Sequence, residues 1–110
     1  MENFWDKPNK AIDKIVGDRK VFYSVDKDMN EVAIEGTCRI VMPHDVWGSD
    51  GGEDYASPVV VNPTWIQLAV LADQGIRVCG DYHHIFFENV RCVGIELITG
   101  VQTYKFIMGS

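Results

Sequence analysis

The chain has 110 residues, of which 46% are hydrophobic and 24% are charged, values that are ordinary for a globular domain. This length predicts one domain, residues 1–110, with a single modest core. No apolar run reaches the roughly 18 residues of a membrane-spanning helix, and the opening MENFWDKPNK lacks the apolar segment of a signal peptide. We therefore expect a cytoplasmic protein with no membrane partner.

The net charge of −6 argues against a protein that binds nucleic acid through bulk positive charge. The cations are unevenly distributed, however, because seven of the ten fall in the first 39 positions. They are Lys7, Lys10, Lys14, Arg19, Lys20, Lys27 and Arg39. A local basic face on an acidic protein is therefore compatible with the composition.

Three cysteines, Cys38, Cys79 and Cys92, form no C-x-x-C pair and are odd in number. This argues against a disulfide framework and favours reduced thiols in a cytosol. Each lies in an apolar stretch, where a cysteine usually acts as a small buried hydrophobe.

The first third of the chain predicts a helix followed by two strands. Residues 8–16, PNKAIDKIV, have apolar side chains at helical spacing after an N-terminal proline. RKVFYSV, residues 19–25, is rich in β-branched and aromatic residues, and residues 32–42 alternate between apolar and polar. We expect these two strands to pair as a hairpin, with Gly36 marking a bend, a bulge or a close approach of another backbone.

The middle third predicts a long loop and a second helix. Residues 43–58 lie between prolines and hold four acids and three glycines. Asn62 and Pro63 resemble a helix N-cap and first residue, and residues 64–78 form a mostly apolar helix with Gln67, Asp73 and Gln74 on its polar side. Residues 43–78 are thus an insertion of a loop plus a helix between two strand pairs.

The last third predicts two strands, residues 83–96 and 101–108, joined around ITGV. The expected order of elements is therefore α-β-β-loop-α-β-β. At the entrance of the first of these strands, GDYHHIFFENV contains two adjacent histidines, His83 and His84, whose side chains would point to opposite faces of a strand.

These residue types could in principle form a zinc site, a calcium loop or a hydrolase site. Paired zinc ligands at fixed spacing are absent, and DVWGSDGGED lacks the acid spacing of an EF-hand loop. Cys79, Asp81 and the two histidines are close in sequence, but no nucleophile motif accompanies them. We expect no cofactor, no metal and no catalytic residue.

Single-stranded RNA is bound by stacking on aromatic, His or Arg side chains together with hydrogen bonds to base edges. The turn that carries Asp81, Tyr82, His83 and His84 offers these groups before a rigid strand. It is therefore a candidate base-contacting loop.

The order of elements resembles the Sm/LSm family. KAIDKIVGDRKVFYSV and VAIEGTCRIV are similar to its opening helix and first strands, GDYHHIFFENVRCV to the centre of its first motif, and VQTYKFIMGS to the strand that leads into its second motif. The chain also resembles small uncharacterised Sm-like proteins of marine cyanophages and ocean metagenomes, through NPTW, GDYHHIF and the terminal GS. For a phage protein, the cytoplasm would be that of the host cell.

The resemblance implies a mainly β (α+β) fold: a small, strongly bent Sm-like β-barrel with an N-terminal helix and an inserted second helix. It also implies a homo-oligomeric ring that binds single-stranded RNA or DNA without catalysis. Carried over by position, Asp81, His83 and His84 lie on the first binding loop, and Met108 and Gly109 stand where the family has Arg-Gly.

Tyr82 would join the base contacts, and cations of the N-terminal third, Lys20 and Arg39 among them, would meet phosphates. Two alternatives remain open. The first is an oligomeric interaction or assembly module without nucleic-acid binding, favoured by the apolar helix 64–78 and by Trp47. The second is a small hydrolase or metal-binding protein.

Overall fold

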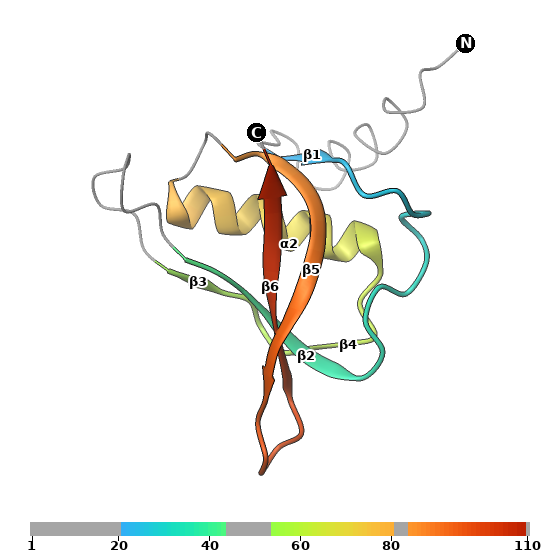
Figure 1. Cartoon of the computed structure of the whole chain (residues 1–110), viewed down its shortest axis with the longest axis vertical. Helices are drawn as coiled ribbons and strands as arrows, with labels where there is room; N and C mark the ends of the chain where they lie inside the picture. The colour runs from blue at the N-terminus through green and yellow to red at the C-terminus, as the bar shows by residue number, and fades with distance from the viewer. Residues whose placement is uncertain (1–20, 44–53, 81–83, 110) are drawn as a thin grey trace.

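The computed structural model describes residues 21–43, 54–80 and 84–109. Among these residues the chain forms six strands and one long helix (Figure 1). In chain order they are β1 (Phe22–Tyr23), β2 (Thr37–Met42), β3 (Tyr55–Ala56), β4 (Val60–Val61), α2 (Trp65–Cys79), β5 (Phe86–Ile95) and β6 (Gln102–Gly109).

The described strands form one mixed sheet in the order β1-β5-β6-β2-β3, with β4 also paired to β2. β5 and β6 pair antiparallel along most of their length, as expected for the predicted final hairpin. β6 and β2 pair in parallel, with Cys38 opposite Gln102. These partners are 64 positions apart in the sequence, and the segment between them includes α2. The hairpin of the last third is therefore confirmed, and it forms the centre of the sheet.

The predicted pairing of the first two strands is wrong. β1 pairs in parallel with β5, through Phe22 opposite Phe86 and Tyr23 opposite Phe87, and not with β2. The stacked rings of Phe22 and Phe86, with centroids 5.5 Å apart, accompany this pairing. Apolar alternation predicts a strand but not its partner, and here aromatic packing against β5 determines the choice.

The alternation along residues 37–42 is confirmed, because Cys38, Ile40 and Met42 are buried and the residues between them are half-buried. β2 begins directly after Gly36, whose φ of 96° requires glycine. The Gly36 amide donates to the Asn62 side chain at 2.6 Å, so Asn62 ties the start of β2 to the segment before α2.

The second helix is confirmed, with a different cap from the one predicted. Thr64 is the N-cap: its hydroxyl accepts from the amide of Gln67, and the Gln67 side chain accepts from the amide of Thr64. This reciprocal arrangement is a capping box. Gly80 ends the helix in a left-handed conformation, and its amide donates to the carbonyl of Ile76.

α2 lies across one face of the curved sheet (Figure 1) and buries Leu68, Ala69, Ala72 and Ile76 against it. Asp73, expected on the polar side of this helix, is 1% exposed. Its carboxylate accepts from the Val21 amide at 3.1 Å and from the Arg77 guanidinium at 2.9 Å. The buried acid therefore joins α2 to the residue that precedes β1.

Two of the three cysteines, Cys38 and Cys79, are buried as predicted, whereas Cys92 is exposed.

The mainly β fold with an inserted helix is confirmed. Among the described residues β1 and β3 end the sheet without pairing to each other, so these strands form an open sheet rather than the predicted closed barrel. The predicted helix 8–16 lies outside the described residues.

Candidate nucleic-acid interface

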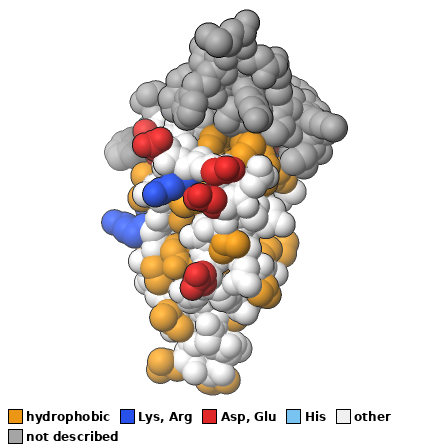
Figure 2. All heavy atoms as spheres, turned by 90° about the vertical axis from the view of Figure 1, so that its right-hand side faces the viewer, with side chains coloured by type: hydrophobic (Ala, Val, Ile, Leu, Met, Phe, Trp, Pro, Cys, Tyr) orange, Lys and Arg blue, Asp and Glu red, His pale blue; other side chains and the backbone are white. Residues whose placement is uncertain are grey.

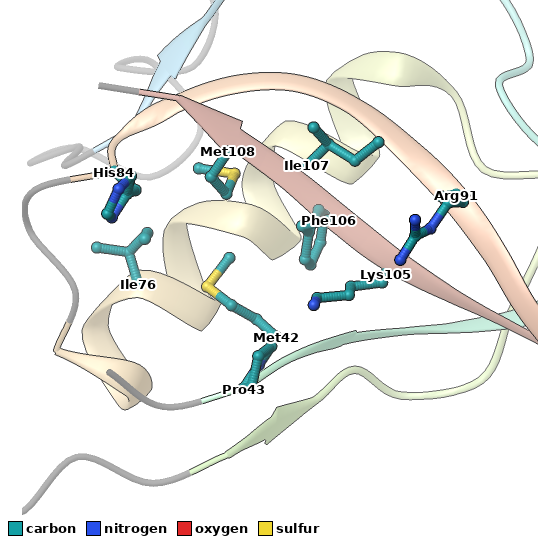
Figure 3. A pocket seen from close by; sticks show the side chains of 9 residues that line it. All are labelled: Met42, Pro43, Ile76, His84, Arg91, Lys105, Phe106, Ile107 and Met108. Atoms are coloured by element: carbon teal, nitrogen blue, oxygen red, sulfur yellow. The ribbon is translucent and has the colours of Figure 1, made fainter. Parts of the chain in front are cut away.

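A pocket of about 390 Å³ lies where two neighbouring strands separate. β2 and β6 pair as far as Val41 and Lys105, after which β2 continues along β3 while β6 stays with β5. We call the opening the fork pocket (Figure 3). It is lined by Met42, Pro43, Ile76, His84, Arg91, Lys105, Phe106, Ile107 and Met108.

The floor of the fork pocket is apolar because it belongs to the hydrophobic core. Met42, Ile76 and Phe106 are buried core residues, and Met108 packs against them. Below this floor the Cys79 thiol is fully buried and donates to the carbonyl of Met42 at 3.1 Å. The Cys79 thiol, a candidate nucleophile by its closeness in sequence to the histidines, is therefore not exposed to the pocket.

The two ends of the fork pocket differ in chemistry. Figure 3 shows Arg91 and Lys105 together at one end and His84 at the other, with the methionines between them. Arg91 and Lys105 are direct cross-strand partners. Because Phe106 faces the core, its neighbour Lys105 projects from the opposite face of the sheet, and Arg91 projects with it.

Arg39 lies on this same face. It alternates along β2 with the buried Cys38 and Ile40, and its register partner Thr103 is two positions from Lys105. Arg39, Lys105 and Arg91 therefore form a basic stripe across β2, β6 and β5. Arg39 lies 3.9 Å from the carboxylate of Glu96, a contact between two side chains that are each more than a third exposed.

The pairing of Arg91 with Lys105 is electrostatically unfavourable by itself, since like charges directly opposite each other destabilise a sheet. Within residues 21–43, 54–80 and 84–109, neither of these two side chains makes an ion pair. An anion placed between them would remove the repulsion. This end of the pocket thus has the electrostatics of an anion site.

Two titrating groups behind the basic stripe remain neutral near pH 7. Burial, with smaller contributions from Cys92 and Cys38, raises the pKa of the Tyr104 hydroxyl. Burial alone raises the pKa of the Cys38 thiol. Neither group therefore places a negative charge beneath the stripe that would offset its attraction for an anion.

The structure brings together some of the residues predicted from the sequence. His84 and Met108 both line the fork pocket, and Arg39 lies in the basic stripe. Gly109 lies outside the lining, and a β-carbon there would be 2.6 Å from the Glu88 carboxylate, which covers it. The other four predicted residues lie outside the described residues, and they are Lys20, Asp81, Tyr82 and His83.

Sequence reasoning missed Arg91 and Lys105, the two cations that define the site. A signal was present, because the strands that contain them were predicted to pair through a short turn. Counting outward from that turn would have placed the two positions close together. An irregularity in the register between Cys92 and Gly94 lies between the turn and this pair, so a simple count would not have given the pair itself.

In the part of the chain that the structure describes, no group of three His, Cys, Asp or Glu side chains is arranged to hold a metal ion. Within that same part, no helix is long and apolar enough to cross a membrane. Comparisons of the chain with protein-family models, with curated proteins and with solved structures found no match. The Sm-like assignment therefore stays a prediction from the sequence.

Proposed function

We propose that this protein binds single-stranded nucleic acid across the basic stripe and the fork pocket. The observation that carries the proposal is the cross-strand pair of Arg91 and Lys105, two cations held side by side without an acidic partner among the described residues. Phosphates are the anions best suited to such a pair, since Arg contacts them in a bidentate manner and Lys as a point charge.

The apolar floor beside the cations is suited to a base. A nucleobase needs a surface for its flat face and polar groups for its edges. Met42 and Met108 are adaptable apolar side chains, and His84 at the far end supplies a ring and a hydrogen-bonding nitrogen. A base can enter the fork pocket only when it is unstacked, which favours single strands over a duplex.

The proposal is consistent with an acidic protein because few phosphates are involved. With the three cations of the basic stripe in contact, the logarithm of the affinity should fall with the logarithm of the salt concentration at a slope of about −2. The resemblance to Sm-like proteins supports the same function, since that family binds single-stranded RNA.

Fluorescence anisotropy with labelled RNA and DNA strands of about 20 nucleotides tests the proposal. The double substitution Arg91→Gln with Lys105→Gln should weaken binding at least about 10-fold and reduce the steepness of the salt dependence by about 1.4. Lys27→Gln is the matched control: it removes an exposed cation that does not line the fork pocket, and it should leave the affinity unchanged.

Two results would contradict the proposal. One is the absence of binding at about 100 μM protein and about 50 mM salt, where even a contact of a few phosphates is measurable. The other is equal loss of affinity in the double variant and in the Lys27 control. A clear preference for RNA or for DNA would instead identify the natural class of strand.

A further inference from the structure

The β5–β6 hairpin ends in an apolar turn. Leu97 and Ile98 are 98% and 99% exposed, at the point farthest along the hairpin (Figure 1). Figure 2 shows hydrophobic side chains at this lower end of the molecule. Turns are usually built from Gly, Pro, Asn, Asp and Ser, so turn formation does not explain two large apolar residues at this position. We call Leu97 and Ile98 the hairpin tip.

The backbone that carries the hairpin tip is held by several hydrogen bonds. The Gly100 amide donates to the carbonyl of Glu96 at 2.9 Å, and the Thr99 hydroxyl donates to the Glu96 carboxylate at 2.6 Å. The Thr99 hydroxyl also accepts from the Val101 amide at 3.2 Å. The tip is therefore preorganised, and binding through it costs little additional conformational entropy.

An apolar groove of about 480 Å³ lies elsewhere on the same chain, between β4 and the first half of α2. Of the described residues that line it, Gln67 alone is not apolar and none is charged. We call it the β4–α2 groove. It is lined by Val60, Val61, Pro63, Ile66, Gln67, Val70 and Leu71.

We propose that the hairpin tip of one copy of this chain occupies the β4–α2 groove of a second copy. Both surfaces are apolar and both belong to one sequence, so two copies supply the tip and its receptor together. The tip does not fill the groove of its own chain, because Leu97 and Ile98 are almost fully exposed. We therefore assign to the groove the tip of another copy of the chain.

The charges near the tip favour a protein partner over a membrane. The tip follows Glu96, and the segment from Val93 to Val101 contains no Lys or Arg that would attract an anionic lipid surface. The described lining of the groove likewise offers no charge to an ionic ligand. Burial of one apolar surface in the other is then the main source of affinity.

The arrangement can close in two ways. In a two-fold dimer each copy gives its tip and receives its partner's, which makes two equal contacts. In a ring each copy contacts a different neighbour on either side.

The tip and groove residues are separate from the fork pocket lining, so this inference does not depend on the proposed nucleic-acid binding.

Light scattering and sedimentation across about 1–100 μM protein, in the usual affinity range of weak oligomers, test the inference. The native chain should have a mass at least twice its 12.4 kDa. Leu97→Ser and Ile98→Ser should each weaken association roughly 10- to 100-fold, from the apolar surface that each would otherwise bury. Val61→Asp, at a groove residue that is 65% exposed, should have a similar effect.

Val78→Ser is the matched control. Val78 is an exposed apolar residue on the same helix, 40% exposed and outside the groove, and its substitution should leave the mass unchanged. Mixing a variant that carries both Leu97→Ser and Ile98→Ser with the Val61→Asp variant should restore association, because the intact tip of the Val61→Asp chain meets the intact groove of the tip variant. This restoration separates a lost contact from general destabilisation.

Three results would overturn the inference. They are a monomer of native chain at about 100 μM, association that survives both tip substitutions, and no recovery on mixing. A monomeric chain whose tip is needed for binding to vesicles of neutral lipid would also overturn it, and would assign the tip to a membrane surface. Arg91→Gln with Lys105→Gln should leave association intact, so a failed nucleic-acid proposal remains distinguishable.

Discussion

Tyr23 is the residue whose titration should most affect stability at alkaline pH. Its ring is 2% exposed and its hydroxyl donates to the carbonyl of Lys27 at 2.9 Å. Burial, followed by the charges of Asp28 and Glu31, raises the pKa of Tyr23 to about 12. In the unfolded chain a tyrosine titrates near about 10.

A group with a raised pKa in the folded state stabilises the protein fully below the unfolded pKa and loses that contribution as pH rises through the folded pKa. The free energy of unfolding should therefore fall between about pH 10 and pH 12. Tyr23→Phe should lower the free energy of unfolding by about 0.5–1.5 kcal/mol at pH 7. Between about pH 10 and pH 12, the free energy of unfolding of this variant should fall less steeply than that of the native chain. Urea denaturation at stepped pH measures both effects, and identical pH curves would contradict the assignment.

Gly75 illustrates a second constraint at the residue scale. A glycine in a helix interior usually costs about 1 kcal/mol relative to alanine. Here a β-carbon at Gly75 would lie 3.0 Å from the ring of Tyr55 and 3.1 Å from the terminal methyl of Met42. The missing side chain allows α2 to approach β2 and β3 closely, which places the helix as the floor of the fork pocket.

At the scale of elements, α2 depends on its N-terminal cap. Thr64→Ala removes the hydroxyl that accepts from the Gln67 amide and should destabilise the protein by about 1 kcal/mol. Thr64→Ser keeps an accepting hydroxyl and should retain most of the stability. Chemical denaturation of the two variants measures the difference. Equal destabilisation by both would indicate that the methyl group of Thr64, and not its hydroxyl, matters.

The strands show how far local patterns determine an element. Residues 37–42 alternate in burial as their sequence predicts, because a sheet with one covered face requires this pattern. The partners of β2 are β6 on one side and β3 and β4 on the other, and all three are distant in sequence or lie in the predicted loop. Alternation carries no information about these partners, so the fork could not be predicted.

At the scale of the whole molecule, Phe87 connects most of the elements. It is fully buried in β5, and its ring packs against Tyr23 of β1, Trp65 of α2 and Phe106 of β6, with centroids 5.6–6.3 Å apart. Phe87→Ala should therefore cost about 3–5 kcal/mol, a large share of the roughly 5–15 kcal/mol that stabilises a typical domain.

Phe86→Ala is the natural comparison for this substitution. Phe86 is the preceding residue, faces the other side of β5 and is 37% exposed. Its removal should cost less than half as much, since much of its surface already contacts water. Thermal and urea unfolding of the two variants give the two free energies. A similar cost for both would place the centre of the core elsewhere than at Phe87.

The sequence by itself determined the class of the fold, the helix after residue 64, the final hairpin and the burial of Cys38 and Cys79. These features follow from local periodicity, capping and turn chemistry, which act over a few residues. It also pointed to His84 and Met108 through a family resemblance, and to Arg39 through the concentration of cations in the first 39 positions.

Only the tertiary structure decided which strands pair, and with that pairing the location of the candidate site. Arg91 and Lys105 become one anion site because the register of β5 and β6 places them opposite each other. Asp73 accepts a hydrogen bond from Val21, 52 positions away in the sequence. Asn62 accepts one from Gly36, 26 positions away. Such contacts depend on the free energy of the whole packed arrangement, which no local window of sequence contains.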